Sequence, residues 1–265
     1  FAEDTYRTLT AVDSVILVVD SVNGVEEQTR RLMEVCRMRD TPVILFINKM
    51  DRDGKNRFDL LEEIEKELSI ELHPMTWPIN SGKEFKGVYN IAEKSLLLFQ
   101  AGTKGTEDTL AVGNLTDSML DVRLGEKDAA ILREDVELID GVHGPLSVDR
   151  YLAGKVAPVF FGSAINNFGV REMLDTFIRI APRPLARATS TRQVDPNEDK
   201  MTGFVFKIHA NLDPKHRDRI AFMRICSGKF ERNKYFHHVR LDGSLSLNDR
   251  DIQQPLLLLL LFSCI

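Results

Sequence analysis

Cysteine is scarce in this sequence: Cys36, Cys226 and Cys264 are the only three, and no two of them form a CxxC pair. This scarcity argues against a disulfide-stapled fold and against a CxxC zinc or redox site, and it favours a reducing, cytoplasmic setting. Long apolar runs are also missing. The longest, residues 256–262, is far short of the roughly 20 residues that a membrane-spanning helix needs. The sequence therefore predicts no membrane partner.

An excess of basic residues is missing as well. The 265 residues include 35 Lys and Arg against 40 Asp and Glu, which gives a formal net charge of −5. This mild acidity argues against tight wrapping of naked nucleic acid, so we expect no DNA partner, although a local basic surface can touch RNA within a larger assembly. Hydrophobic residues make up 43% and charged residues 28%, which is typical of a folded domain rather than a disordered or fibrous chain.

The first part of the chain alternates apolar runs with amphipathic stretches. Residues 14–20 and 43–47 are short, β-branched apolar runs, and the stretch from Glu26 to Arg39 between them has helical spacing. Such a βαβ pattern favours a parallel sheet that helices cover on both faces. A further helix is expected from Phe58 to Leu68, followed by an extended segment at 74–79.

The pattern is less regular further along the chain. Residues from about 82 to 155 are rich in glycine and mixed charge, which predicts an insertion with a helix near 126–139. A last buried strand is predicted over 156–161. The amphipathic helix that follows, at 170–178, is stopped by Pro182.

The periodicity changes after the first domain. Residues 183–200 are rich in Pro, Arg, Thr and Asp, which predicts a linker over 186–200. Strand-forming residues dominate 203–209 and 219–225, which predicts antiparallel strands at the beginning of a β-barrel domain over 201–242. Residues 243–265 include six consecutive leucines and are expected to be a tail outside the barrel pattern.

The most specific motif is Asn48-Lys49-Met50-Asp51, at the carboxyl end of the second apolar run. In an open α/β sheet, ligands gather beyond the carboxyl ends of strands. An ionised Asp51 can accept two hydrogen bonds, which matches the N1–H and amino group of guanine, whereas adenine offers no such donor pair. Asn48 can brace the loop and reach the base, and the aliphatic stem of Lys49 can cover the ring. A simpler interpretation makes Asp51 only the cap of the next helix.

A second candidate loop is Gly162-Ser163-Ala164, directly after the strand predicted over 156–161. Its tight turn can bring backbone amides to the O6 atom of guanine. Taken singly, such a turn is more often a plain strand-to-helix connection. Because both loops follow buried strands, we expect them to form one guanine site from Asn48, Lys49, Asp51, Ser163 and Ala164.

These motifs resemble those of translational GTPases, and most closely those of the release factor three family of class II peptide chain release factors. The resemblance covers residues 1 to about 241 and includes the segments EDTYRTLTAVDS (3–14), RDTP (39–42), NKMDRD (48–53), TWPI (76–79), FKGVY (85–89), PVFFGSA (158–164), NFGV (167–170) and DPKHRDR (213–219). The first, fourth and last of these segments look like release factor three rather than elongation factor G, whose sequences differ there.

The resemblance implies a P-loop-type GTPase domain over 1–185 that uses GTP or GDP with Mg²⁺. It also implies a place on the ribosome, in contact with ribosomal RNA and proteins, where the protein promotes departure of class I peptide release factors during termination. An elongation factor G-like translocation GTPase and a non-catalytic ribosome-binding fragment remain alternatives. The three polar residues of the first motif carry over as the guanine-specificity motif, and Ser163-Ala164 as the second base-contacting loop.

The phosphate-binding parts of that family are missing from this sequence. No GxxxxGK[ST] segment occurs, and Gly82-Lys83-Glu84 and Gly154-Lys155-Val156 lack both the leading glycine spacing and the hydroxyl. Residues 1–9 look like the continuation of the second switch segment, and they carry neither an initiator methionine nor a signal peptide. We therefore expect that the N-terminal part of the domain is missing, together with the Mg²⁺ ligands. The chain alone is then inactive in hydrolysis, with no catalytic and no metal-binding residue of its own.

Other side chains have simpler interpretations. Trp77 is expected in the core, and the acid pair Glu62-Glu63 on a solvated helix face. The basic cluster at 215–219 is either an RNA contact or a solvated turn. Four histidines are expected to pack or to lie at the surface rather than to bind metal: His209, His216, His237 and His238.

Overall fold

A computed structural model of the protein describes residues 2–100, 108–112, 114–210, 219–231, 235–238 and 243–246. These residues divide into two compact units. One consists of residues 14–181, and the other combines residues 2–13 with those from 182 onward.

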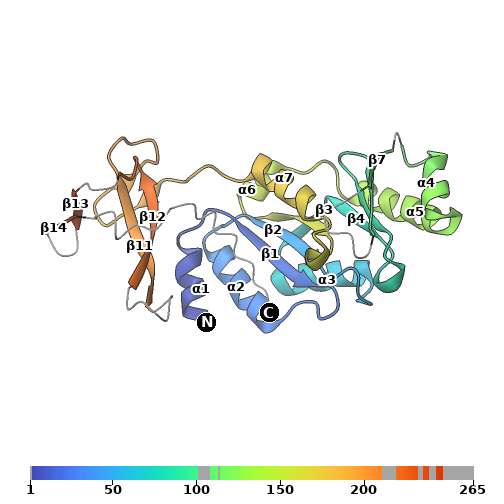
Figure 1. Ribbon diagram of the computed structural model, residues 1–265, viewed down its shortest axis with the longest axis horizontal. Coiled ribbons are helices and arrows are strands. Elements are labelled where there is room, and N and C mark those ends of the chain that lie inside the picture. Colours follow the sequence, from blue (N-terminus) through green and yellow to red (C-terminus); the bar gives the residue numbers. More distant parts are fainter. Residues whose placement is uncertain are drawn as a thin grey trace. The chain divides into compact units, whose positions relative to one another are not determined.

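A four-stranded parallel sheet organises the unit of residues 14–181 (Figure 1). Its strand order is β1-β2-β8-β3, with bounds Val15–Asp20, Val43–Asn48, Val156–Phe161 and Glu71–Pro74. Strands β2 and β8 are buried along nearly their whole length. Figure 1 shows α2 (Glu27–Met38) and α3 (Arg57–Leu68) on one side of this sheet and α7 (Val170–Ile180) on the other. The predicted α/β architecture with a parallel sheet is confirmed.

Helix α3 illustrates how the sequence sets these elements. Asn56 caps its first turn, because the side-chain Oδ1 accepts a hydrogen bond from the backbone N of Phe58 at 2.9 Å. Leu60, Ile64 and Leu68 recur every four residues and are all buried. The apolar stripe of the helix is therefore the face that packs, as amphipathic spacing predicts.

An antiparallel sheet forms part of the expected insertion, in the order β4-β5-β6-β7. Its strands are Thr76–Ile79, Gly87–Asn90, Ser95–Leu98 and Asp108–Ala111. The extended segment predicted at 74–79 is in fact divided, because β3 joins the parallel sheet while β4 begins the antiparallel one. Three helices follow, α4 (Ser118–Leu124), α5 (Glu126–Val142) and α6 (Val148–Leu152), and the second of them confirms the helix expected near 126–139.

Trp77 ties this antiparallel sheet to the parallel one. Its side chain is fully buried, and its indole Nε1 donates a hydrogen bond to Asp135 Oδ2 at 2.9 Å. The ring centroid lies 4.8 Å from that of Phe58 and 5.6 Å from that of Phe161, the last residue of β8. Next to it, Thr76 Oγ1 accepts a hydrogen bond from Phe161 N at 3.0 Å. The prediction that Trp77 is a core residue is confirmed.

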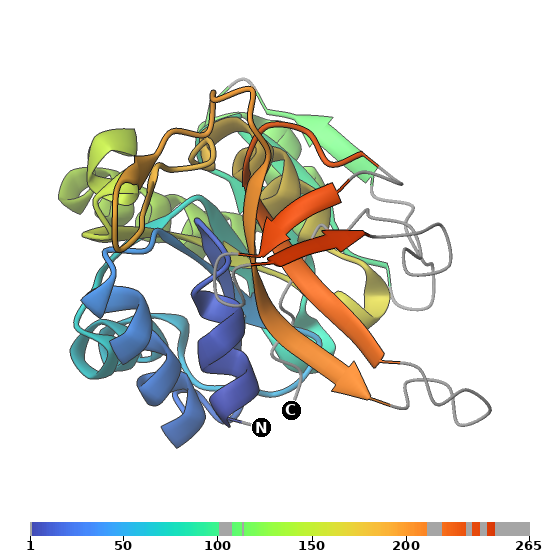
Figure 2. The ribbon, with the colours of Figure 1, turned by 90° about the vertical axis from the view of Figure 1, so that its left-hand side faces the viewer.

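The second unit contains helix α1 and only antiparallel strand pairs (Figure 2). Its elements are α1 (Ala2–Leu9), β9 (Arg187–Ala188), β10 (Gln193–Val194), β11 (Thr202–Ala210), β12 (Arg219–Ser227), β13 (Tyr235–His238) and β14 (Gly243–Ser246). The pair β11-β12 matches the two strands predicted from sequence. The range expected to be a linker holds the β9-β10 hairpin, in which Val194 is buried. Strand β14 lies inside the range expected to be a tail.

A cluster of charges fixes the chain after α1 within this unit. Asp13 Oδ1 accepts a hydrogen bond from Arg187 Nη2 at 2.6 Å, and Asp13 Oδ2 accepts one from Arg224 Nη2. The two guanidinium groups also donate to the backbone carbonyls of residues 10–12 at 3.1 to 3.2 Å. The Asp13 side chain is only 10% exposed, and the Nε atoms of both arginines are buried and have no hydrogen-bond partner within the part of the chain that the structure describes. One carboxylate therefore balances two largely buried cations.

Candidate functional site

Two loops leave the same edge of the parallel sheet. Asp20 of β1 and Asn48 of β2 are register partners, and so are Ile47 of β2 and Phe161 of β8. Because the strands are parallel, the loops that follow β2 and β8 emerge side by side at their carboxyl ends. The Asn48-Lys49-Met50-Asp51 motif and the Gly162-Ser163-Ala164 turn are therefore neighbours.

Asn48 joins the two loops directly. Its side-chain Oδ1 accepts hydrogen bonds from the backbone N of Lys49 and of Ala164, both at 2.8 Å, and it spans 116 positions of sequence to reach the latter. Backbone contacts reinforce the junction, since Met50 N donates to Gly162 O at 3.1 Å and Gly162 N donates to Ile47 O at 2.9 Å. The bracing role predicted for Asn48 thus has a geometric basis in the fold.

The turn after β8 already uses its own amides. Ser163 N donates to Phe168 O at 3.1 Å, and Ala164 N donates to Asn48 Oδ1. Gly162 fits here because a Cβ atom would lie 2.2 Å from the carbonyl oxygen of Phe168. The amides expected to reach guanine O6 therefore have protein acceptors, and a base carbonyl has to compete with Asn48 for the Ala164 N–H.

Asp51 carries a buried acceptor that is open to a ligand. Its Oδ1 atom is buried and has no hydrogen-bond partner among the described residues. The interpretation of Asp51 as a helix cap is wrong, because α3 begins at Arg57 and is capped by Asn56. A buried carboxylate oxygen without a partner is unfavourable in the free protein. It is therefore suited to a ligand that brings an N–H group.

Lys49 is held from the neighbouring strand. Its backbone has a φ of 67°, in the left-handed region, and its Nζ lies 2.5 Å from Asp20 Oδ2. Burial acts to raise the pKa of Asp20, but the hydrogen bonds from Lys49 and from the backbone N of Val22 outweigh it, so the pKa lies below its usual value. The Asp20 carboxylate is therefore ionised at neutral pH.

Ser21 adds three further hydrogen bonds to the same loop. Its N donates to Asn48 O at 3.0 Å, its Oγ donates to Lys49 O at 3.0 Å, and its O accepts from Lys55 N at 2.9 Å. The residue is almost fully buried. Neither Asp20 nor Ser21 was predicted to belong to the site. The sequence shows that an apolar run ends in these two polar residues, but not that the run lies beside the motif strand.

Glu63 corrects one sequence expectation. The acid pair Glu62-Glu63 was expected on a solvated face, and Glu62 is exposed. Glu63 instead accepts hydrogen bonds from Val25 N at 3.0 Å and from Lys55 Nζ at 2.6 Å. It therefore links α3 to the loop after β1 and to the end of the motif loop. The spacing along α3 places Glu63 on the polar face of the helix, but it does not reveal that Val25 and Lys55 from other segments bind its carboxylate.

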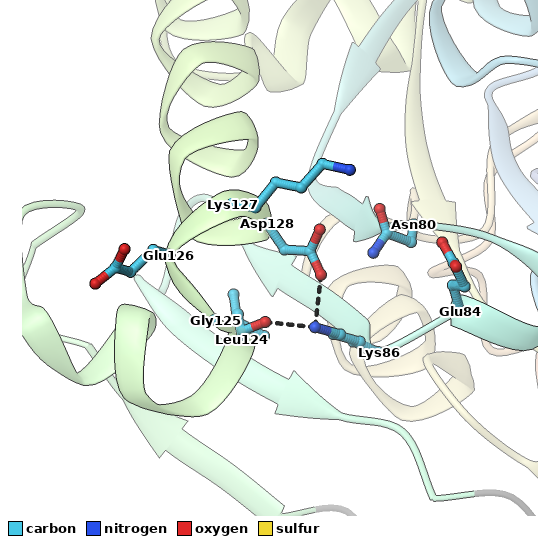
Figure 3. Close-up of a pocket in the computed structure, with 8 residues that line it drawn as sticks. All are labelled: Asn80, Glu84, Lys86, Leu124, Gly125, Glu126, Lys127 and Asp128. Atoms are coloured by element: carbon cyan, nitrogen blue, oxygen red, sulfur yellow. Dashed lines mark hydrogen bonds and ion pairs between the residues drawn. The ribbon is translucent and has the colours of Figure 1, made fainter.

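A cavity of about 430 Å³ lies away from these loops (Figure 3). Figure 3 shows Lys86 at its centre, donating to Leu124 O and paired with Asp128 Oδ2 at 2.5 Å. None of the five residues predicted to bind the base lines it; the lining residues are Asn80, Glu84, Lys86, Leu124, Gly125, Glu126, Lys127 and Asp128. The central cation of this cavity therefore already has two acceptors in the cavity wall.

The described residues hold neither a cluster of metal ligands nor a membrane-spanning helix. They contain no group of three or more His, Cys, Asp or Glu side chains placed to hold a metal ion, and none of their helices has the length and apolarity to cross a bilayer. The side chains of His216, His237 and His238 lie outside the described part of the chain, as does most of the basic cluster at 215–219.

Two protein families match the chain. The elongation factor Tu GTP binding domain matches residues 1–183, and elongation factor G domain 2 matches residues 200–258. The second match runs past the barrel boundary predicted at 242. A crystal structure of a protein from Thermus thermophilus aligns over 93% of this chain with a TM-score of 0.66 and 20% sequence identity, a likeness of fold. This chain covers 36% of the length of that protein.

The first of these matches covers well over half of the sequence. The parallel sheet lies within the residues that the first family matches, and strands β11 to β14 lie within those that the second family matches. The chain therefore belongs to the translational GTPase family, with an elongation factor Tu-type GTP-binding domain followed by strands that resemble elongation factor G domain 2.

Proposed function

We propose that the loops after β2 and β8 bind the guanine base of GTP or GDP. The observation that carries this proposal is the buried, partnerless Oδ1 atom of Asp51. Guanine presents two N–H donors on one edge, and a carboxylate accepts both, which gives an ionised aspartate a preference for guanine over adenine. The proposal is supported by the position of Asp51 at the carboxyl edge of a parallel sheet, where α/β proteins bind ligands.

The other four predicted residues have distinct roles in this proposal. Asn48 braces the two loops through Lys49 N and Ala164 N. The aliphatic stem of Lys49 covers one face of the base. Ser163 fixes the turn after β8 through its paired backbone contacts with Phe168, and Ala164 offers its amide to O6 in exchange for Asn48.

On the ribosome, we propose that the protein promotes release and recycling of class I peptide release factors during termination. The segments that look like release factor three support this role, including TWPI at 76–79 and DPKHRDR at 213–219. The match of residues 200–258 to elongation factor G domain 2 favours a second candidate, a translocation GTPase. A non-catalytic ribosome-binding role is the third. All three place the protein in the cytoplasm.

The phosphate side of the reaction has no counterpart in the described residues. The sequence contains no GxxxxGK[ST] segment, and no described cluster of acidic or histidine side chains fits Mg²⁺. We therefore assign no catalytic step to Mg²⁺ here, and we propose that this chain alone hydrolyses GTP negligibly. The division into a GTP-binding domain at 1–185, a linker at 186–200, a barrel at 201–242 and a tail at 243–265 stays a prediction.

Nucleotide competition on the full chain tests the base site. Fluorescent GDP is bound first, and unlabelled GDP and ADP are then titrated as competitors. We expect GDP to displace the probe and ADP to fail, and we expect the preference to disappear in Asp51→Asn but to persist in Asp59→Asn, an exposed acid on α3. Equal competition by GDP and ADP, or no binding of either, would contradict the proposal.

A ribosome assay separates the candidate roles. Release factor recycling and translocation are measured in parallel with the same preparation. Stimulation of recycling alone supports the termination role, and stimulation of translocation alone supports the elongation factor G-like role. Binding to ribosomes without stimulation of either supports the non-catalytic role.

A further inference from the structure

Lys49 is held by contacts at its backbone and at the end of its side chain. Its backbone N donates to Asn48 Oδ1 at 2.8 Å, its carbonyl accepts from Ser21 Oγ at 3.0 Å and from Arg52 N at 2.9 Å, and its Nζ lies 2.5 Å from Asp20 Oδ2. Its φ of 67° is costly for a residue with a Cβ atom and persists only where the surroundings enforce it. The loop therefore holds Lys49 in one conformation at both its backbone and its side-chain end.

Asp20 is held in place by contacts other than the one with Lys49. It is the last residue of β1, a register partner of Asn48, and its Oδ1 accepts a hydrogen bond from Val22 N at 2.8 Å. Its side chain is 15% exposed, against 33% for Lys49. A carboxylate held by its own turn loses little further freedom when it pairs with an ammonium group. The pair is thus anchored on the strand and reaches toward the loop.

An exposed lysine stem otherwise samples many rotamers, and ordering it on binding costs free energy. An anchor at Nζ removes part of that cost, because the four-carbon stem is then stretched between two fixed ends. Nothing in the NKxD motif itself supplies such an anchor, since its other residues contact backbone atoms or remain open.

We propose that Asp20 is a positioning residue for guanine recognition: it holds the Lys49 ammonium at the end of β1, so that the lysine stem is already placed where the base packs. This inference rests on the proposed guanine site. The inference adds Asp20 to the proposed guanine site. This residue lies on a different strand, 29 positions before Lys49, and it tunes affinity without touching the base.

A double-mutant cycle on GDP binding tests the inference. The full chain is compared with Asp20→Asn, Lys49→Met and the double variant, with Asp59→Asn as the matched loss of an exposed charge. The methionine keeps an apolar stem and removes the ammonium group. We expect Asp20→Asn to raise the Kd for GDP by about ten-fold when Lys49 is present, and by less than about two-fold when Lys49→Met has already removed the ammonium group.

A measurement without nucleotide accompanies the cycle. Hydrogen exchange of peptides over residues 48–55 is recorded for the free chain and for Asp20→Asn, together with their thermal unfolding midpoints. We expect faster exchange in that segment at an unchanged midpoint, because the anchor orders the loop and not the whole sheet. A purely structural ion pair would lower the midpoint and leave the GDP coupling absent.

The outcomes separate the inference from the function on which it rests. If the unsubstituted chain binds no guanine nucleotide, both fail. If it binds GDP and Asp20→Asn binds equally well, or more tightly, or if the effects of the two substitutions add, the inference alone is overturned. Unchanged exchange over 48–55 in Asp20→Asn overturns it as well.

Discussion

Two aspartates with buried oxygen atoms have opposite surroundings in the two units. Asp13, beside the antiparallel strands, receives a guanidinium group on each of its oxygens. Asp51, at the edge of the parallel sheet, keeps a buried oxygen with no partner. A satisfied acceptor stabilises the fold, whereas an unsatisfied one costs stability and is available to a ligand. The contrast sets a stabilising role for Asp13 against the binding role proposed for Asp51, and substitutions can test the two roles separately.

The largest expected effect is that of Asp13→Asn on stability. The change leaves two largely buried guanidinium groups without their counter-charge, and each already has an unpaired Nε. We expect the free energy of unfolding to fall by about 3 kcal/mol, measured by urea denaturation, with GDP affinity unchanged under conditions in which the protein is folded. Arg192→Ala, which removes an exposed ion pair with Glu198, is the control. If the folded variant lost binding free energy for GDP comparable to its loss of unfolding free energy, the separation between a folding role for Asp13 and a binding role for Asp51 would be contradicted.

Asp51→Asn is expected to act on the ligand and not on the fold. An asparagine replaces one acceptor by an N–H donor, so it mismatches the amino group of guanine and matches the C2 carbonyl of xanthine. We expect GDP to bind on the order of 100-fold more weakly and xanthosine diphosphate to bind more tightly than GDP. Titration with both nucleotides checks this. An unchanged preference would mean that Asp51 does not contact the base.

The substitution Glu63→Gln tests a carboxylate whose exposure, 24%, lies between that of Asp13 and that of the surface pair of Glu71 and Arg150. The hydrogen bond from Lys55 holds the pKa of Glu63 below its usual value, against a smaller opposing effect of burial. A lowered pKa in the folded state stabilises the protein above the unfolded pKa, and this contribution is lost as pH falls through the folded value. We expect the variant to lose about 1 kcal/mol at neutral pH. The difference from the parent should shrink as the pH falls below the ordinary pKa of a glutamate and disappear below the lowered pKa of Glu63. A difference that grows on acidification would contradict this.

The smallest effect is expected at Glu71 and Arg150, whose two hydrogen bonds of 2.9 and 2.6 Å lie at the surface. Both side chains are about half exposed, so solvent and salt screen the pair. We expect Arg150→Met to leave the thermal midpoint within the error of the measurement at physiological salt. A loss comparable to that of Asp13→Asn would show that burial does not set the order of these effects.

The parallel sheet could be predicted because the sequence of its strands indicates that they are buried. Strands β1 and β2 each begin with five consecutive apolar residues, and β8 is apolar over all six. Such runs indicate burial on both faces. The amphipathic helices between them show their buried stripe in the sequence, as Leu60, Ile64 and Leu68 do in α3. For these elements, local pattern and tertiary packing agree.

The antiparallel sheet could not be predicted in this way. Its strands have four residues each, too few for an alternating pattern to stand out. Gly87 is fixed by a partner strand, because a Cβ atom there would lie 1.9 Å from Leu97 O. In a sequence this glycine looks like a loop residue, and only the pairing of β5 with β6 explains it.

The candidate site was predictable in its motif and not in its support. The letters of the two loops point to Asn48, Lys49, Asp51 and the Ser163-Ala164 turn without any coordinates. Asp20 and Ser21 matter only because β1 lies beside β2 in register. No local pattern encodes that neighbour relation, so the residues that hold the loop remained hidden.

The hydrogen bond from Ala164 N to Asn48 Oδ1 has a consequence for the order of events during synthesis. It closes over 116 positions, so the first loop leaves the ribosome long before its partner exists. A nascent chain that ends before Ala164 contains the whole NKxD motif, including Asn48, but lacks the amide that bonds to the Asn48 side chain. Because chains are made at roughly 5–20 residues per second, several seconds separate the two halves. The nucleotide affinity proposed for these loops is then expected to begin at the chain length that delivers β8 to the sheet.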